Sequence, residues 1–234
     1  MEKDLLKERL ANVHERIEKT CLKIGQDPKN IKLLLATKMV PSEIILKAFE
    51  LNECLIGENR VQELLQKYDS LLVKEHSTHL IGHLQSNKIN KIINKVSCVE
   101  SVDNIELASK INDKLCEINQ TLDILIEVNT SGEKSKYGLS PSEVLSVIEK
   151  CSMFPFLKIK GLMTIGSLTE NVNEIRKCFR LLKQISEKIK QERFENVSME
   201  VLSMGMSSDF EIAIEEGATE IRLGSIIFGS RSYT

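Results

Sequence analysis

Short apolar runs alternate with longer amphipathic segments along most of this 234-residue chain. We interpret the apolar runs as strands, at residues 31–36, 54–56, 79–81, 97–99, 122–128, 159–163, 200–202 and 220–223. Between them, apolar residues at helical spacing predict helices near residues 41–51, 59–73, 86–95, 103–119, 141–150, 171–192 and 207–216. Strands that alternate with helices in this way predict an α/β protein with a parallel sheet covered by helices.

Eight strand-and-helix units in a chain of this length predict a single (β/α)8 TIM barrel. A doubly wound open sheet stays the alternative, because periodicity does not show whether a sheet closes. No linker rich in glycine, serine or proline divides the chain, so we expect residues 1–234 to form one domain. Residues 2–24 predict an extra N-terminal helix, which would pack on the barrel through Leu6, Leu10, Val13 and Ile17.

The composition excludes several classes of protein. Hydrophobic residues make up 41% and charged residues 28%, and the net charge of -2 gives no global attraction to nucleic acid or to an anionic membrane. The first ten residues, MEKDLLKERL, are too charged for a secretion signal, and no apolar run approaches the ~20 residues that span a bilayer. Six scattered cysteines without a CxxC pair fit reduced thiols, so we expect a cytoplasmic protein.

Polar residues follow the predicted strands, where a barrel of this class forms its functional face. Lys38 ends the first strand, and partial loss of water there would favour its neutral amine, the form that attacks carbonyl groups. Alternatively, Lys38 extends its charged end to solvent or to a carboxylate such as Glu58. From this residue alone both interpretations stay open.

The last two strands predict an anion site. Ser207 precedes a helical pattern, and Gly224-Ser225 follows the eighth strand, so free backbone N–H groups and hydroxyls would meet there. Arg222 would point into the barrel mouth or form an inward structural ion pair. A Schiff-base lysine that faces a phosphate site suggests an aldehyde carrying a phosphate, either pyridoxal phosphate or a sugar phosphate.

Seven segments between residues 36 and 231 carry a family resemblance: ATKMVP, IGENRVQE, LIGHLQSNK, NTSGEKSKYG, GLMTIG, LSMGMSSDFEIAI and IRLGSIIFGSR. In this order they resemble the pyridoxal phosphate homeostasis family, whose members are single barrels related to the N-terminal domain of alanine racemase. Seven matched segments over nearly the whole chain make the resemblance specific.

The resemblance implies pyridoxal 5′-phosphate as the cofactor and a role for each of several residues. Lys38 matches the lysine that forms the internal aldimine, and Arg222 matches the arginine that faces the pyridine nitrogen. The implied phosphate ligands are Ser207, Gly224 and Ser225, and the implied pocket lining is Asn59, Met163 and residues 203–206. The chain departs from the usual family residues at Arg60, His83 and Lys134, which puts partner contacts in question more than cofactor binding.

The same site bears on catalysis. Arg222 only donates hydrogen bonds, so it would keep the ring nitrogen unprotonated and weaken the cofactor as an electron sink. The related racemases add a tyrosine base from a separate C-terminal domain. This chain ends at Thr234 after the barrel, and Tyr68, Tyr137 and Tyr233 match no such motif.

We therefore expect a protein that binds and releases pyridoxal phosphate in intracellular homeostasis, without turnover. An amino-acid racemase that uses this cofactor is the alternative. A Schiff-base sugar-phosphate aldolase is third, because only Glu58 offers it an acid/base partner. Pyridoxal-phosphate-dependent apo-enzymes would receive the cofactor, and we expect a monomer.

No metal site is predicted, because His76 and His79 would point to opposite faces of a strand. Lys88, Lys91 and Lys95 are too few to indicate nucleic-acid binding.

Overall fold

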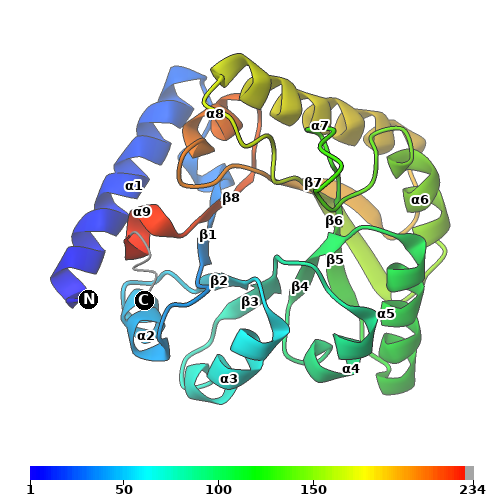
Figure 1. Cartoon of the computed structure of the whole chain (residues 1–234), viewed down its shortest axis with the longest axis horizontal. Helices are drawn as coiled ribbons and strands as arrows, with labels where there is room; N and C mark the ends of the chain where they lie inside the picture. The colour runs from blue at the N-terminus through cyan, green and yellow to red at the C-terminus, as the bar shows by residue number, and fades with distance from the viewer. Residues whose placement is uncertain (230–234) are drawn as a thin grey trace.

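Eight parallel strands close into a barrel in the part of the chain that the computed structural model describes, residues 1–229 (Figure 1). The strands follow in sequence order, and β8 pairs with β1 to close the sheet. Their bounds are β1 Lys32–Ala36, β2 Leu55–Glu58, β3 Ser77–Leu80, β4 Cys98–Val102, β5 Leu122–Glu127, β6 Leu157–Met163, β7 Val197–Ser203 and β8 Glu220–Leu223. Closure confirms the predicted (β/α)8 barrel and excludes the open sheet.

Helices surround the barrel, as Figure 1 shows. Their bounds are α2 Ser42–Glu50, α3 Val61–Leu71, α4 Ile89–Ile92, α5 Ile105–Ile118, α6 Val144–Cys151, α7 Val172–Glu192, α8 Phe210–Glu215 and α9 Ser225–Phe228. Two short 3-10 helices, η1 Pro28–Asn30 and η2 Ser86–Lys88, precede β1 and α4. None of the helices within residues 1–229 combines the length and the apolar character that a membrane crossing needs.

The N-terminal helix α1, Lys3–Lys23, lies on the outside of the barrel beside α8 and α9 (Figure 1). The four apolar residues that the sequence assigned to its packing face, Leu6, Leu10, Val13 and Ile17, are all buried. The predicted additional helix and its buried face are therefore confirmed, with bounds one residue shorter at each end.

The barrel has two apolar regions of different size. The larger lies between the sheet and the surrounding helices. The smaller consists of Cys98, Leu125 and Met163, with Val201 packed against it. These residues come from β4, β5, β6 and β7. Charged side chains, among them Glu100 and Arg222, are also buried on these strands and on β8, so the sheet holds polar chemistry as well as apolar packing.

Candidate functional site

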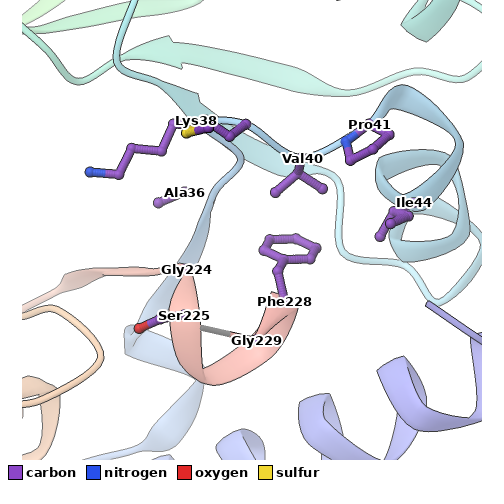
Figure 2. A pocket seen from close by; sticks show the side chains of 10 residues that line it. Ala36, Lys38, Val40, Pro41, Ile44, Gly224, Ser225, Phe228 and Gly229 are labelled. Carbon is purple, nitrogen blue, oxygen red and sulfur yellow. The ribbon is translucent and has the colours of Figure 1, made fainter. Parts of the chain in front are cut away.

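A cavity of about 210 Å³ opens between the loop after β1 and the start of α9. Its polar lining comes from Lys38, Gly224 and Ser225, three of the residues that the sequence singled out. Figure 2 shows the side chains of Lys38 and Ser225 extending to one side, while Val40, Ile44 and Phe228 form an apolar group on the other. The cavity thus combines an amine, a hydroxyl and an apolar wall.

Closure of the barrel brings the first and the last strand together at this cavity. Leu35 of β1 pairs with Leu223 of β8, so the residues that follow both strands emerge side by side. A Cβ atom at Gly224 would lie 3.1 Å from the carbonyl oxygen of Ala36. Any larger residue would crowd this backbone contact, which explains a glycine at the junction.

Ser207 connects the loop after β7 to the same turn. Its hydroxyl oxygen accepts hydrogen bonds from the backbone N–H groups of Gly224 and Ile226, both at 3.3 Å. The sequence placed Ser207 at the beginning of a helix, but it lies in a turn and α8 begins at Phe210. The Asp209 side chain accepts a hydrogen bond from the Met206 N–H at 2.6 Å, which holds this turn closed.

The end of β1 is held in place by a buried ion pair. Glu58 Oε1 accepts hydrogen bonds from Thr37 Oγ1 at 2.6 Å and from Lys67 Nζ at 2.8 Å. Lys67 also donates to the carbonyl oxygen of Thr37 at 2.8 Å. Thr37 and Glu58 are almost fully buried. These contacts fix the backbone from which Lys38 projects, and they engage Oε1 of the carboxylate that the sequence offered to Lys38.

Arg222 is 5% exposed, and its guanidinium lies inside the barrel. Its Nη1 donates to Ser203 Oγ and its Nη2 to the carbonyl oxygen of Thr164, both at 2.7 Å. The sequence left open whether Arg222 points into the barrel mouth or forms an inward structural ion pair. In the structure, the hydrogen bonds of Arg222 go to a hydroxyl and a carbonyl. Two of its five N–H groups are engaged in these bonds.

Asn59 and Met163, two further sequence candidates, are placed outside the lining of this cavity. Asn59 follows β2, and its side-chain oxygen is buried without a hydrogen-bond partner among the described residues. Met163 is 1% exposed and packs with Cys98 and Leu125. Met163 therefore supports the site from within the apolar packing of the barrel, whereas Asn59 retains a buried acceptor that a ligand could use.

The three departures from the usual family residues lie at the surface. Arg60, His83 and Lys134 are all exposed, and none of them lines the cavity. His83 stacks on the ring of Tyr137 with 4.1 Å between ring centroids. These positions therefore leave the polar lining of the cavity unchanged.

Sequence reasoning missed the buried charges beneath the mouth. Glu100 lies within β4, a strand buried at all five residues, and Glu127 ends β5. Burial, together with the nearby negative charge of Asp103, raises the pKa of Glu127 to about 7. A glutamate inside an otherwise apolar run, as in CVESV, was the signal that could have identified Glu100.

Comparison with known proteins places this architecture in a family. The family model described as the alanine racemase N-terminal domain matches residues 41–232. A protein of Aquifex aeolicus, named pyridoxal phosphate homeostasis protein, is 42% identical over 226 residues. That alignment covers 97% of this chain and 98% of the relative.

Solved structures agree with the sequence matches. A crystal structure from Bifidobacterium adolescentis has a TM-score of 0.91 and 34% identity, covering 97% of this chain and 95% of the other. PipY of Synechococcus elongatus, solved with pyridoxal phosphate bound, has a TM-score of 0.85 and 29% identity. That match covers 96% of this chain and 100% of PipY.

Proposed function

The chain belongs to the pyridoxal phosphate homeostasis protein family, and from this membership we propose that it binds pyridoxal 5′-phosphate and takes part in homeostasis of that cofactor. The observation that carries the proposal is the cavity in which Lys38 meets the Gly224-Ser225 turn. An amine and an anion site side by side match the two reactive ends of the cofactor, its aldehyde and its phosphate.

The phosphate end would be held by Ser207, Gly224 and Ser225. The N–H groups of Gly224 and Ile226 donate to Ser207 at 3.3 Å, which is longer than the usual ~2.9–3.0 Å. Bonds of this length leave the two donors available to a stronger acceptor, and a phosphate oxygen is a strong one. The Ser225 hydroxyl lines the same cavity and adds a further donor.

The aldehyde end would react with Lys38. We propose that its amine condenses with the aldehyde to a Schiff base, with release of one water molecule. Thr37, held by Glu58 and Lys67, fixes the backbone immediately before Lys38. A fixed lysine and an anchored phosphate make the condensation effectively intramolecular, which favours the bound form.

Arg222 supports a role as a carrier rather than an enzyme. A guanidinium has donors and no acceptor, so at the ring nitrogen it would keep that nitrogen unprotonated. The cofactor would then stabilise carbanions poorly. We therefore propose that the chain acts without turnover, as a cytoplasmic monomer that supplies pyridoxal-phosphate-dependent apo-enzymes.

A racemase-type activity is the second candidate, and Glu127 is the observation that favours it. Its carboxyl is buried, and burial raises its pKa to about 7, a value suited to proton transfer near neutral pH. Incubation of the protein with single enantiomers of amino acids tests this candidate. Racemisation that disappears in Glu127→Gln would support an enzyme, and its absence in the unaltered protein would support the carrier.

The absorption spectrum of the purified protein, before and after borohydride, tests the main proposal. We expect a yellow protein whose visible band is removed by borohydride. Lys38→Ala should lose the visible band and keep its fold, because Lys38 lies at the rim of the cavity. Lys88→Ala is the matched control, since Lys88 is also a half-buried lysine in a segment that follows a strand. A band that persists in Lys38→Ala would contradict the assignment.

A further inference from the structure

A continuous chain of hydrogen bonds lies beneath Arg222. Ser203 Oγ accepts from Arg222 Nη1 at 2.7 Å and donates to Glu100 Oε2 at 2.6 Å. On the other side of this carboxylate, His79 Nδ1 lies 2.7 Å from Glu100 Oε1. The four residues come from β8, β7, β4 and β3, so the chain crosses the barrel from one wall to another.

The hydrogen bonds from Arg222 through Ser203 to Glu100 all run in one direction, from donor to acceptor. A hydroxyl carries a single proton, so Ser203 can accept from the guanidinium and donate to the carboxylate at the same time. Glu100 and Ser203 are fully buried and Arg222 is 5% exposed, so water does not screen the two charges as it would at the surface. Ser203 therefore transmits the position and the charge of Glu100 to Arg222.

A second buried carboxyl, that of Glu220, lies beside the carboxyl of Glu100. One side-chain N or O atom from each of His79, Glu100 and Glu220 lies within 4.8 Å of the other two. Two buried carboxyls this close do not both ionise, and their pKa values are pushed apart. Burial, and then the charge of Glu100, raise the pKa of Glu220 to about 8. Burial alone would raise the pKa of Glu100 as well, but His79, Arg222 and Ser203 lower it below its ordinary value.

We propose that Glu100, acting through Ser203, is a positioning residue for Arg222. Glu100 is the ionised member of the pair, and Glu220 holds the proton. The carboxylate keeps the guanidinium at the place where it would face the ring nitrogen and offsets part of its positive charge. The inference rests on the proposed function, because the ring nitrogen belongs to pyridoxal phosphate.

Other charged groups face this network from neighbouring elements. Arg222 lies near Glu127 at the end of β5 and near Asp209 before α8. Burial raises the pKa of both carboxyls, and the positive charge of Arg222 opposes that rise. Lys32 and Asp123 lie near the Glu100 and Glu220 end of the network. The charges of all four side chains act on the pKa of the Cys98 thiol. Among the carboxylates within residues 1–229, Glu100 is the one joined to Arg222 through a chain of hydrogen bonds.

A divalent cation is the competing explanation for the three clustered side chains. Zinc bonds of about 2.0–2.1 Å in a tetrahedral site separate neighbouring ligand atoms by roughly 3.3 Å. His79 Nδ1 and Glu100 Oε1 are only 2.7 Å apart, and both Glu100 oxygens already accept hydrogen bonds. Glu220 Oε1 is buried without a partner among the described residues, which disfavours a negative charge on this carboxyl and favours its neutral, protonated form. The geometry favours a shared proton over a metal.

The first measurement uses the protein without cofactor. The side-chain 15N resonances of Arg222, assigned by their loss in Arg222→Lys, report whether the guanidinium is held. We expect separate resonances in the unaltered protein and in Glu220→Gln, because glutamine copies a protonated carboxyl. Glu100→Gln and Ser203→Ala should merge or shift them. Unchanged resonances in both variants would overturn the proposal.

The second measurement uses the protein loaded with pyridoxal phosphate. Removal of the Glu100 charge disfavours a proton on the nitrogen that joins the cofactor to Lys38. The pH midpoint of the visible band should therefore fall by about one unit in Glu100→Gln. Ser203→Ala keeps both charges, so it should move the midpoint by less than Glu100→Gln does, and Glu220→Gln should leave it in place. An equal shift in Glu220→Gln and Glu100→Gln would overturn the assignment of the two carboxyls.

Two further outcomes separate the alternatives. If Glu100→Gln does not fold, Ser203→Ala carries the resonance measurement, because it removes the link and no charge. If the protein binds no pyridoxal phosphate, the proposed function fails, but the resonances of Arg222 still test the positioning. One zinc ion per chain in the purified protein, lost in His79→Ala, would overturn the shared proton in favour of a metal site.

Discussion

At the barrel mouth, Lys38 and Ser207 are half-buried and Ser225 is exposed. In the protein interior, Glu58 between β2 and α3, and Glu100 and Arg222 within the barrel, are at most 5% exposed. The mouth offers a cavity and two N–H groups held by long 3.3 Å bonds. The interior groups make hydrogen bonds of 2.6–2.8 Å to Thr37, Lys67 and Ser203. The two regions lie close together and differ in how firmly their polar groups are engaged.

This difference predicts which substitutions change ligand binding and which change the stability of the protein. Polar groups at the mouth are available to a ligand, and their loss removes few contacts within the protein. Charges in the interior depend on their partners, because a buried charge left alone is strongly unfavourable. Substitutions at the mouth should therefore change affinity, and substitutions in the interior should change the free energy of unfolding.

The largest expected effect is that of Lys67→Ala. This change leaves the 1% exposed Glu58 carboxylate without its positive partner. Breaking a buried ion pair from one side typically costs about 3–5 kcal/mol, so we expect a loss of that size in the free energy of unfolding, measured with denaturant. Lys114→Ala is the control, because its pair with Glu117 is solvent-exposed and should contribute about 1 kcal/mol or less. Equal losses in the two variants would contradict the contrast between interior and surface.

Glu127→Gln tests the interior through pH. Burial raises the pKa of Glu127 from 4.5 to about 7, so the folded state holds this proton more tightly than the unfolded state. The resulting stabilisation is complete below pH 4.5 and is lost as the pH rises through 7, an effect of roughly 3 kcal/mol at 1.36 kcal/mol per unit.

Glutamine does not titrate, so the variant should become more stable relative to the unaltered protein as the pH rises from 5 to 8. The free energy of unfolding at the two pH values measures the change. A difference between the two proteins that is the same at pH 5 and pH 8 would show that Glu127 titrates normally.

The smallest expected effect is that of Ser207→Ala at the mouth. The change removes one hydroxyl near the proposed phosphate, and a hydrogen bond to a charged group contributes about 1.5–3 kcal/mol. We expect weaker pyridoxal phosphate binding by that amount in a titration, with little change in unfolding. Ser208→Ala, an exposed neighbour, should bind like the unaltered protein. A large loss of stability in Ser207→Ala would place Ser207 with the interior groups.

Most of the fold could be predicted because each strand and helix follows from local periodicity. The eight strands appear within a few residues of their predicted positions, and so does α1. Helix boundaries were less accurate where side chains compete with the helix. The segment predicted at residues 86–95 contains a 3-10 turn before α4, and the helix predicted from residue 207 begins at Phe210 after the turn held by Asp209. The short helix α9 was not predicted, because it has only four residues.

The site residues at the mouth could be predicted from the sequence, whereas the contacts of those in the interior could not. Lys38, Ser207, Gly224 and Ser225 lie in short segments that directly follow strands, so their place at the mouth could be predicted. The contacts of Glu100 could not, because Ser203 is 103 residues away in the chain and meets it only when the barrel closes. Arg222 was identified as a site residue, but its partners Ser203 and Thr164 depend on the same closure. The residues Ser230, Arg231 and Tyr233 lie outside the described part of the chain.

Peptide mapping of the borohydride-reduced protein tests the central claim most directly. The protein is loaded with pyridoxal phosphate, reduced, digested and analysed by mass spectrometry to locate the modified lysine. The account predicts a single major site at Lys38, in the peptide that contains ATKMVP. Modification mainly at another lysine near the mouth, such as Lys88 or Lys136, would contradict it.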